Sequence, residues 1–325
     1  MTVAQQPRVL VLGEVMRVLV AEPGDTVDRA ERFRSTIGGA EGNVAAALAR
    51  QDVPAAWVGR VGDDDAGRYV LRRMRAEGVD VADVTVDRSS FTGLLIRNTS
   101  AHGAISVTYH RAGSAGSRVS AADVARAWER QRPSLVHVTG ISALLSDEAL
   151  GAVVELLDRA AADDVPVSFD VNLRLRLAPA ERWRDVVPPL VSRAQIVFAG
   201  DAELAVLAPD AGPQVSAQQW LAGSAEVVVV KNGDHTCTAF TADGEVTQPT
   251  LVRSVVDPVG AGDALVAGFL AAHLTGADAA GCLARGAAAA AFAVQHWSDT
   301  EGLPTGSELD AFVAAIGRTG EQVLR

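Results

Sequence analysis

The residues best suited to chemistry lie at positions 257–263, where the sequence DPVGAGD precedes an apolar helical pattern. A glycine turn that leads into a helix leaves backbone N–H groups pointing outward at the positive end of the helix dipole, which favours an anion. Asp263 falls in the first helical turn. A carboxylate there can take a proton from a hydroxyl while the N–H groups stabilise a transferring phosphoryl group. The alternative is that Asp263 only caps the helix.

A second glycine-containing stretch, GGAEGN, occupies positions 38–43 and precedes the helical pattern of 44–51. Gly38 and Gly39 would let a ligand approach the backbone closely. Asn43 offers both a donor and an acceptor, which suits sugar hydroxyls. Taken alone, the stretch is equally typical of a helix N-cap.

Two further readings of these glycines are weak. Gly260–Gly262 is a fragment of a dinucleotide-binding fingerprint, but no N-terminal βαβ unit precedes it and the later acidic partner is missing. No GxxxxGK[ST] loop is present in the sequence, so a Walker-type phosphate loop is excluded.

Together, the two stretches resemble the signatures of the ribokinase or PfkB family of carbohydrate kinases, with similarity from residue 8 to about residue 305. The resemblance implies an α/β fold with a ribokinase-like, Rossmann-type three-layer core and a small β-sheet lid. It implies transfer of the γ-phosphoryl group of ATP to a sugar hydroxyl. Asp263 would be the catalytic base, and Gly260, Ala261 and Gly262 would form the anion hole, with both glycines also contacting ATP.

The resemblance also implies a nucleotide side with ATP and Mg²⁺ as cofactors. Residues 227–233, VVVVKNG, match the family's strand and turn beside adenine and ribose, which places Lys231 and Gly233 near ATP. The family's Asn-x-x-Glu motif falls on residues 200–203, where Glu203 is kept and glycine replaces the asparagine. Glu203 is therefore expected to act on the metal indirectly, since Mg²⁺ is held largely by phosphates and water. Some relatives need a monovalent cation, so K⁺ is a further candidate.

The acceptor side resembles the 2-keto-3-deoxygluconate kinases of this family. Residues 109–117, YHRAGSAGS, and residues 169–174, FDVNLR, match two of their substrate-side stretches. By this resemblance Tyr109 contacts the substrate, and Arg111 and Arg174 approach the carboxylate of a sugar acid. A guanidinium fork matches the geometry of a carboxylate. The alternative for each arginine is a solvated surface charge.

Other positions refine this expectation. Val18 stands where fructokinases and ribokinases usually carry an aspartate, which weakens a neutral-sugar reading. Leu95 and His110 replace two tyrosines of the relatives. The remaining substrate-side positions implied by the family are Gly38, Gly39, Asn43, Ile141 and Asp299.

These features predict an ATP-dependent kinase that converts 2-dehydro-3-deoxy-D-gluconate into its 6-phosphate. The alternatives are a fructokinase-like enzyme, a 5-keto-2-deoxygluconate kinase, and a sugar-binding protein that has lost catalysis. The partners expected are a small sugar acid, ATP and further copies of the chain in a homo-oligomer.

Short apolar runs alternate with longer helical patterns, which predicts a mostly parallel sheet covered by helices on both faces. The predicted strands span residues 8–12, 55–58, 135–139, 167–171, 196–199 and 227–231. The predicted helices span residues 44–51, 66–77, 121–131, 147–162, 179–192, 263–274, 277–296 and 307–317.

Two segments break this rhythm, because residues 15–37 and 91–111 contain short alternating stretches typical of antiparallel strands. They predict a small sheet inserted into the core, which could act as a lid. The core would then comprise residues 1–14, 38–90 and 112–325.

Composition excludes several classes of protein. The 325 residues carry a net charge of −11, which argues against a nucleic-acid partner. The two cysteines form no metal or disulfide pattern. No apolar run is long enough to cross a bilayer and the N-terminus lacks a signal pattern, which predicts a cytoplasmic protein without a membrane partner.

Overall fold

A computed structural model of the chain describes residues 8–99, 105–252 and 254–316. Its centre is an eight-stranded sheet in the order β14-β13-β12-β11-β10-β9-β1-β4. The pairings from β12 to β4 are all parallel, and β13 and β14 add an antiparallel hairpin at one edge. The strands of this sheet are β1 (Val9–Leu12), β4 (Ala55–Val58), β9 (Leu135–Thr139), β10 (Val167–Asp170), β11 (Ile196–Gly200), β12 (Val227–Lys231), β13 (Thr236–Thr241) and β14 (Gly244–Pro249).

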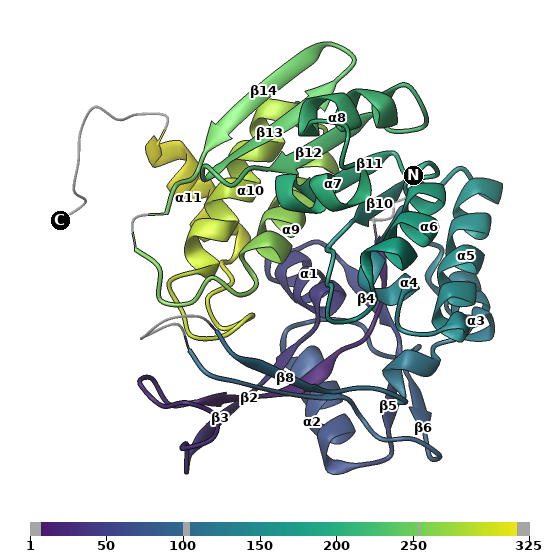
Figure 1. Ribbon diagram of the computed structural model, residues 1–325, viewed down its shortest axis with the longest axis vertical. Helices are drawn as coiled ribbons and strands as arrows, with labels where there is room; N and C mark the ends of the chain where they lie inside the picture. Colours follow the sequence, from purple (N-terminus) through teal and green to yellow (C-terminus); the bar gives the residue numbers. More distant parts are fainter. Residues whose placement is uncertain (1–7, 100–104, 253, 317–325) are drawn as a thin grey trace, which may run out of the picture.

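Helices cover both faces of the main sheet, as the alternation of elements predicts (Figure 1). One face packs against α1 (Ala40–Arg50), α2 (Asp65–Ala76), α9 (Ala261–His273), α10 (Ala279–Ala293) and α11 (Gly306–Ile316). The other packs against α3 (Ala121–Gln131), α4 (Gly140–Ala143), α5 (Asp147–Ala162), α6 (Ala180–Val191), α7 (Asp201–Leu207) and α8 (Pro213–Leu221). The α/β three-layer core expected from the sequence is therefore confirmed.

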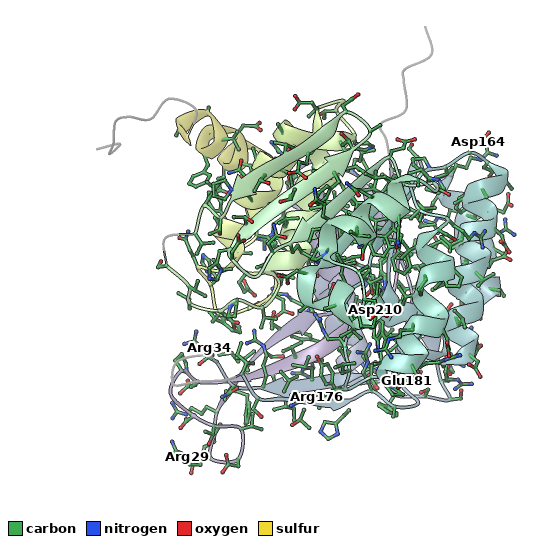
Figure 2. The ribbon with its side chains drawn as sticks, turned by 45° about the horizontal axis from the view of Figure 1, so that its top comes forward. Arg29, Arg34, Asp164, Arg176, Glu181 and Asp210 are labelled. Carbon is green, nitrogen blue, oxygen red and sulfur yellow. The ribbon has the colours of Figure 1, made fainter. Side chains whose placement is uncertain are left out.

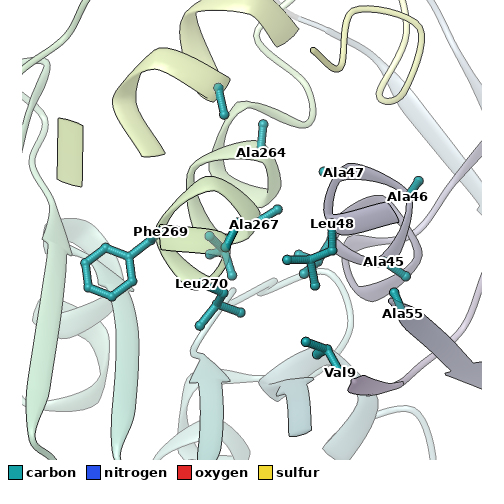
Figure 3. Close-up of a cluster of buried hydrophobic side chains, with 14 of the residues drawn as sticks. Val9, Ala45, Ala46, Ala47, Leu48, Ala55, Ala264, Ala267, Phe269 and Leu270 are labelled. Carbon is teal, nitrogen blue, oxygen red and sulfur yellow. The ribbon is translucent and has the colours of Figure 1, made fainter. Parts of the chain in front are cut away.

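The central strands are apolar throughout because both of their faces are buried. In β1, Val9 and Val11 belong to the core under α1 and α9, whereas Leu10 and Leu12 belong to the core under α3 and α5. Figure 3 shows the first of these cores, where Ala47 and Leu48 of α1 lie on the side of α9, facing Ala267, and Ala45 points instead toward Ala55 of β4. Small side chains let two helices pack closely, and this contact sets the relative position of the two N-termini that carry the glycine motifs.

A second, four-stranded sheet lies apart from the main sheet in the order β3-β2-β7-β8 (Figure 1). We call it the small sheet; it consists of β2 (Met16–Ala21), β3 (Phe33–Gly38), β7 (Leu94–Arg97) and β8 (Val107–His110). The expected small sheet is confirmed, but β2 pairs with β7 in parallel, where antiparallel strands were predicted. Residues 22–93, which include α1 and α2, separate these two strands along the chain. No hairpin turn joins them, so their relative direction is not fixed by a turn. The division of the chain into a core and a lid at particular residues stays a prediction.

The small sheet is tied to the core at several points. Arg176, on the loop after β10, donates to the backbone oxygen of Val107 at 3.0 Å, and Figure 2 shows this arginine beside the small sheet. Val18, Val20 and Leu95 form a separate apolar cluster with Met16 on one face of the small sheet. A two-stranded sheet of β5 (Arg60–Gly62) and β6 (Thr85–Asp87) and a 3₁₀ turn at Gly116–Arg118 complete the described elements.

The predicted elements agree with the structure most closely where a cap fixes an end. The helices 121–131 and 147–162 and three of the predicted strands have the expected bounds. The helix predicted at 44–51 begins instead at Ala40, and the one predicted at 263–274 begins at Ala261. In both cases the last residues of the glycine-containing stretch, for which the sequence predicts a turn, already belong to the helix. The edge hairpin β13–β14 and helices α7 and α8 were not predicted.

Candidate active site

A cavity of about 380 Å³ lies at the carboxyl ends of the parallel strands, between the main sheet and the small sheet. Glu14 follows β1, Asn172 follows β10, and Lys231 ends β12. Leu95 and Tyr109 reach the cavity from the small sheet. Ligands in open α/β sheets bind at this edge, because the strands end there and the following helices begin there.

Asp263 lines the cavity in the first turn of α9. The N-cap of that helix is Gly260, which has a left-handed backbone (φ 85°). Asp263 therefore is not the cap. Its Oδ2 instead accepts a hydrogen bond of 2.7 Å from Nδ2 of Asn43, which comes from α1.

Asn43 lies inside α1, whose N-cap is Gly39 with φ 149°. The interpretation of Asn43 as an N-cap is therefore wrong, because the helix begins three residues earlier. The glycines before it make room for neighbouring groups. A Cβ on Gly39 would lie 2.1 Å from the backbone oxygen of Glu14, and a Cβ on Gly38 would lie 2.9 Å from Oδ2 of Asp299.

The carboxyl of Asp263 has an unusual proton affinity. Burial raises its pKa to about 7, and the carboxylates of Asp170 and Asp299 add to the rise, while the hydrogen bond from Asn43 and the charge of Lys231 oppose it. A general base works best when its pKa lies near the working pH. Asp263 therefore has the environment that a base near neutrality needs.

The start of α9 provides backbone donors beside this carboxylate. Gly260 and Gly262 line the cavity, and the first N–H groups of a helix have no intrahelical acceptor. Ala261 is not among the lining residues in the described part of the chain, and its N–H lies 3.4 Å from the oxygen of Pro258. The candidate donors toward the cavity are thus the N–H groups of the two glycines, at the positive end of the helix dipole.

Lys231 brings a cation to the same end of the cavity. Its Nζ binds both carboxylate oxygens of Asp170, at 2.9 and 3.1 Å, and would lie 3.8 Å from a Cβ on Gly262. Burial lowers its pKa, but Asp170, Glu203 and Asp263 raise it more, so the net direction is upward. Lys231 is therefore charged next to the turn at which an anion would bind.

Of the other two nucleotide-side candidates, Glu203 lines the cavity and Gly233 does not. Both oxygens of Glu203 accept backbone N–H groups, from Leu173 at 2.9 Å and from Gly200 at 2.7 Å, and Glu203 lines the cavity. This fits an indirect role toward a metal, because the carboxylate already fixes two backbone segments. Gly233 is exposed outside the cavity, and its N–H donates to Asp201 at 2.8 Å.

Tyr109 of β8 and Arg111, directly after this strand, also line the cavity. Arg111 is already paired, because its Nε and Nη2 contact Oε2 of the buried Glu14 at 2.7 and 2.6 Å. Ser114 also donates to Glu14. The Arg111 guanidinium lies 5.6 Å from the centroid of the Tyr109 ring. In the described residues Nη1 of Arg111 has no partner, so one edge of the fork remains for a ligand.

Arg174 and Ile141 complete the acceptor side. The side chain of Arg174 is 51% exposed, and its nearest carboxylate, Glu203, is 4.0 Å away. Ile141 is buried in α4 and lines the cavity. Leu95 faces Tyr109 across the β7–β8 pair and lines the cavity, whereas His110 pairs with Leu94 on the other face. Of the two departures from the relatives, only Leu95 touches the cavity.

Asp299 lies next to the GGAEGN stretch of residues 38–43, and its Oδ2 is 3.4 Å from Nδ2 of Asn43. Its Oδ1 contacts Arg97, a buried arginine of β7, at 3.2 Å. Burial raises the pKa of Asp299, and the charge of Arg97 opposes that rise.

Several cavity residues were missed by the sequence reasoning. They are Glu14, Glu41, Arg97 and Asn172, together with Asp170, which does not line the cavity but binds Lys231. Only Asp170 and Asn172 carried a usable signal, since they belong to the FDVNLR stretch. Glu41 is buried and accepts from Thr139 and Ser142, and this burial raises its pKa.

Two observations bear on metals and membranes. No group of three or more His, Cys, Asp or Glu side chains is placed to hold a metal ion among residues 8–99, 105–252 and 254–316. No helix in the same ranges has the length and apolar character that crossing a bilayer requires.

The sequence matches known proteins over nearly its whole length. The model of the "pfkB family carbohydrate kinase" matches residues 6–306. The chain is 32% identical over 306 residues to 2-dehydro-3-deoxygluconokinase of Bacillus subtilis, covering 93% of this chain and 94% of that protein. It is 28% identical over 293 residues to 5-dehydro-2-deoxygluconokinase of Geobacillus thermodenitrificans, covering 87% and 86%.

Solved structures agree in fold. A PfkB protein from Polaromonas is 35% identical and superimposes with a TM-score of 0.84 over 94% of this chain and 99% of that one. A ribokinase-like protein of Escherichia coli in complex with ATP and Mg²⁺ is 23% identical, with a TM-score of 0.87 over 96% and 100%. A Vibrio cholerae fructokinase with bound fructose, ADP and potassium is 23% identical, with a TM-score of 0.82 over 95% and 98%.

Proposed function

The chain belongs to the PfkB family of carbohydrate kinases, and we propose that it transfers the γ-phosphoryl group of ATP to the 6-hydroxyl of 2-dehydro-3-deoxy-D-gluconate. The observation that carries the proposal is the layout of the cavity. The same cavity is lined by a carboxylate with a pKa of about 7 at a helix N-terminus and by an arginine with a free edge. The similarity to a 2-dehydro-3-deoxygluconokinase supports the choice of acceptor.

Asp263 would act as the general base. Asn43 holds its Oδ2, which leaves Oδ1 free in the described residues to accept the proton of the hydroxyl. As that oxygen attacks the phosphorus, negative charge spreads over the transferring group. The N–H groups at the start of α9 would stabilise this charge, and Lys231 would add a cation beside them.

The site has the chemistry to receive ATP with Mg²⁺. Gly260 and Gly262 leave space at the helix N-terminus, and Lys231 lies next to them. Mg²⁺ would neutralise phosphate charge when bound, and Glu203 would support it indirectly by fixing Gly200 and the loop after β10. K⁺ remains a candidate that activity measurements with Na⁺ and K⁺ would decide.

Recognition of the acceptor would use the small sheet and the loops that face it. The free edge of Arg111 would bind the carboxylate of the sugar acid, with Arg174 at the entrance and Tyr109 and Ile141 against the sugar carbons. The carboxylate of Glu14 offsets part of the positive charge that Arg111 presents to a ligand, but it also fixes the orientation of the guanidinium. A substrate carboxylate would bind more tightly to a guanidinium whose orientation is already fixed, because less conformational entropy is lost on binding.

A second candidate is a 5-dehydro-2-deoxygluconokinase, which the similarity to such an enzyme favours. Leu95 also favours it, because this side chain leaves the cavity without the tyrosine expected of the first candidate. Coupled ADP release, measured with both keto-acids, fructose and ribose, separates these candidates. We expect 2-dehydro-3-deoxygluconate to give the highest kcat/KM, and a higher value for either neutral sugar would reject the sugar-acid proposal.

We also infer that the small sheet closes over the acceptor and that the enzyme is a homo-oligomer. Closure would keep water away from the phosphoryl group during transfer. Exposed apolar residues of the small sheet, Phe33 and Tyr109, and the neighbouring Phe91 support association between copies. Light scattering of the purified chain measures the oligomeric state directly.

A further inference from the structure

Arg97 is a buried arginine that joins the small sheet to the catalytic end of the cavity. It belongs to β7, yet its side chain is only 1% exposed and its guanidinium reaches the core. Nη1 contacts Oδ2 of Asp257 at 2.6 Å, and Nη2 contacts Oδ1 of Asp299 at 3.2 Å. Nη2 also donates to the backbone oxygen of Trp297 at 3.1 Å. One side chain of the small sheet therefore holds two carboxylates of the core.

The contact with Asp257 leads to the turn that begins α9. Oδ1 of Asp257 accepts the N–H of Val259 at 3.1 Å, which fixes the first residues of the turn. Gly260 follows with its left-handed backbone, and a Cβ there would lie 2.9 Å from the backbone oxygen of Asp299. The turn is thus held between Asp257 and residue 299, both of which Arg97 contacts.

The contact with Asp299 leads to the base. Oδ2 of Asp299 is 3.4 Å from Nδ2 of Asn43, and the same amide donates to Asp263 at 2.7 Å. Moving Asp299 would therefore move the amide that orients Asp263. The guanidinium of Arg97 connects to the backbone donors through Asp257 and to the base through Asp299.

We propose that Arg97 is a positioning residue for phosphoryl transfer, which couples the seating of the small sheet on the core to the geometry of the turn at 258–262 and of Asp263. The proposal rests on the proposed role of Asp263 as the base. Arg97 acts through Asp257 and Asp299 and takes no part in proton transfer. A small sheet that is not seated would leave both carboxylates without their cation, so transfer would be efficient only when the small sheet is in place.

A merely structural ion pair would behave differently. Replacing a buried ion pair by uncharged groups often leaves stability unchanged, whereas removal of one partner leaves a buried charge and destabilises. A loss of activity in Arg97→Met alone could therefore come from lost stability or from lost positioning, and the two causes would not be separated. Arg97→Met combined with Asp257→Asn removes both charges of the pair with Asp257, and the asparagine oxygen can still accept the N–H of Val259. Asp299 keeps its contact with Asn43 but loses its cation, so thermal unfolding is measured beside activity.

The matched control is Arg60→Met with Asp123→Asn. This pair joins β5 to α3 through a contact of 2.6 Å, is also largely buried, and does not line the cavity. Each double variant is compared with the wild type in thermal unfolding, in kcat and KM with the best acceptor of the sugar panel, and in hydrogen exchange of the peptide spanning 257–264. Arg97→Lys tests partial rescue, since an ammonium cannot hold both carboxylates as a fork does.

We expect the Arg97 and Asp257 double variant to fold, to keep KM for ATP within threefold, and to lose about 100-fold in kcat, because small misplacements cost that much. Arg97→Lys should fall between it and the wild type, exchange in 257–264 should rise at least tenfold, and the control should change kcat less than twofold. A folded double variant with kcat within threefold of the wild type would overturn the proposal.

These outcomes stay separate from those for the proposed function. The ratio of variant to wild-type kcat can be measured with whichever sugar the panel identifies, so a wrong acceptor does not affect it. If no acceptor is turned over, the proposed function fails. The exchange measurement then decides on Arg97 alone, because unchanged exchange in 257–264 would reject the coupling.

Discussion

The two ends of the cavity are built in different ways. At the transfer end, Asp263, Asn43 and Lys231 come from helices and a strand of the core, and each is held by a hydrogen bond to a neighbour in the site. On the proposed acceptor side, Tyr109 comes from the small sheet, Arg111 directly follows it, and Arg174 lies on an exposed loop. If the proposed roles hold, the comparison teaches that transfer depends on the core, while acceptor choice depends on a smaller and more exposed part of the fold.

Asp263→Asn should have the largest effect on the transfer end. The amide keeps the contact with Asn43 in shape but cannot take a proton, so kcat should fall by about 10² to 10⁴ while ATP still binds. Steady-state kinetics and calorimetric ATP binding measure both. Asp278→Asn is the matched control, since Asp278 caps α10 by accepting the N–H of Gly281 and lies away from the cavity. More than a tenth of wild-type turnover in Asp263→Asn would remove Asp263 as the base.

Arg111→Ala should have the next largest effect, and only on the acceptor end. The lost charge-assisted hydrogen bonds contribute about 1.5–3 kcal/mol, which is about 10- to 150-fold in kcat/KM for the keto-acid. KM for ATP should stay within twofold. Arg118→Ala removes another arginine of the same segment, whose partner is Asp87, and should leave kcat/KM unchanged. An equal loss in both variants would contradict a direct role for Arg111.

The pH profile tests the environment of Asp263. Because only the ionised carboxylate accepts a proton, kcat/KM should fall as pH drops through about 7 and level off above it. One unit below the midpoint, about a tenth of the groups are ionised. Asn43→Ala removes a hydrogen bond that lowers the pKa of Asp263, so the midpoint should move upward by about one unit. A midpoint that stays in place, or moves down, would contradict the assigned contact.

Arg174→Ala should have the smallest effect, although sequence reasoning treated Arg174 and Arg111 alike. Its side chain is 51% exposed and its only carboxylate neighbour is at 4.0 Å among the described residues. Exposed charges contribute less than about 1 kcal/mol, so kcat/KM for the keto-acid should fall no more than about fivefold. Arg182→Ala, another exposed arginine that pairs with Asp147, serves as the control. A loss above tenfold would mean that closure buries Arg174.

The sequence predicted the main sheet well because its central strands are buried on both faces and read as continuous apolar runs. It did not predict β13 and β14. β14 is the edge strand and is largely exposed, so its sequence resembles a loop. β13 is largely buried, but the threonines in TCTAFT interrupt its apolar residues, so it does not form a continuous apolar run. Both glycine motifs were recognised, but their helices begin earlier than expected, since glycines at a helix start look like a turn. The earlier start of α1 removes the alternative that Asn43 only caps a helix, and it leaves the expectation of Asn43 as a side chain of the site.

The missed site residues show the limit of local patterns. Glu14 meets Arg111 across 97 positions, and Arg97 meets Asp257 and Asp299 across 160 and 202. The local sequence around a charged residue does not indicate which distant residue will be its ion-pair partner. Only the packing of the small sheet on the core brings these pairs together, so the motifs located Asp263, Asn43 and Lys231 but not Glu14 or Arg97.

A competition assay tests most directly whether Arg111 determines the choice of acceptor separately from phosphoryl transfer. The keto-acid and fructose, at equal concentrations with saturating ATP, are offered together to the wild type and to Arg111→Ala, and mass spectrometry quantifies both phosphate esters as a measure of the ratio of kcat/KM. We expect the wild type to favour 2-dehydro-3-deoxygluconate by at least tenfold, and Arg111→Ala to lose most of that preference while its rate on fructose is unchanged. A wild type that favours fructose, or a variant that loses both rates equally, would contradict the account.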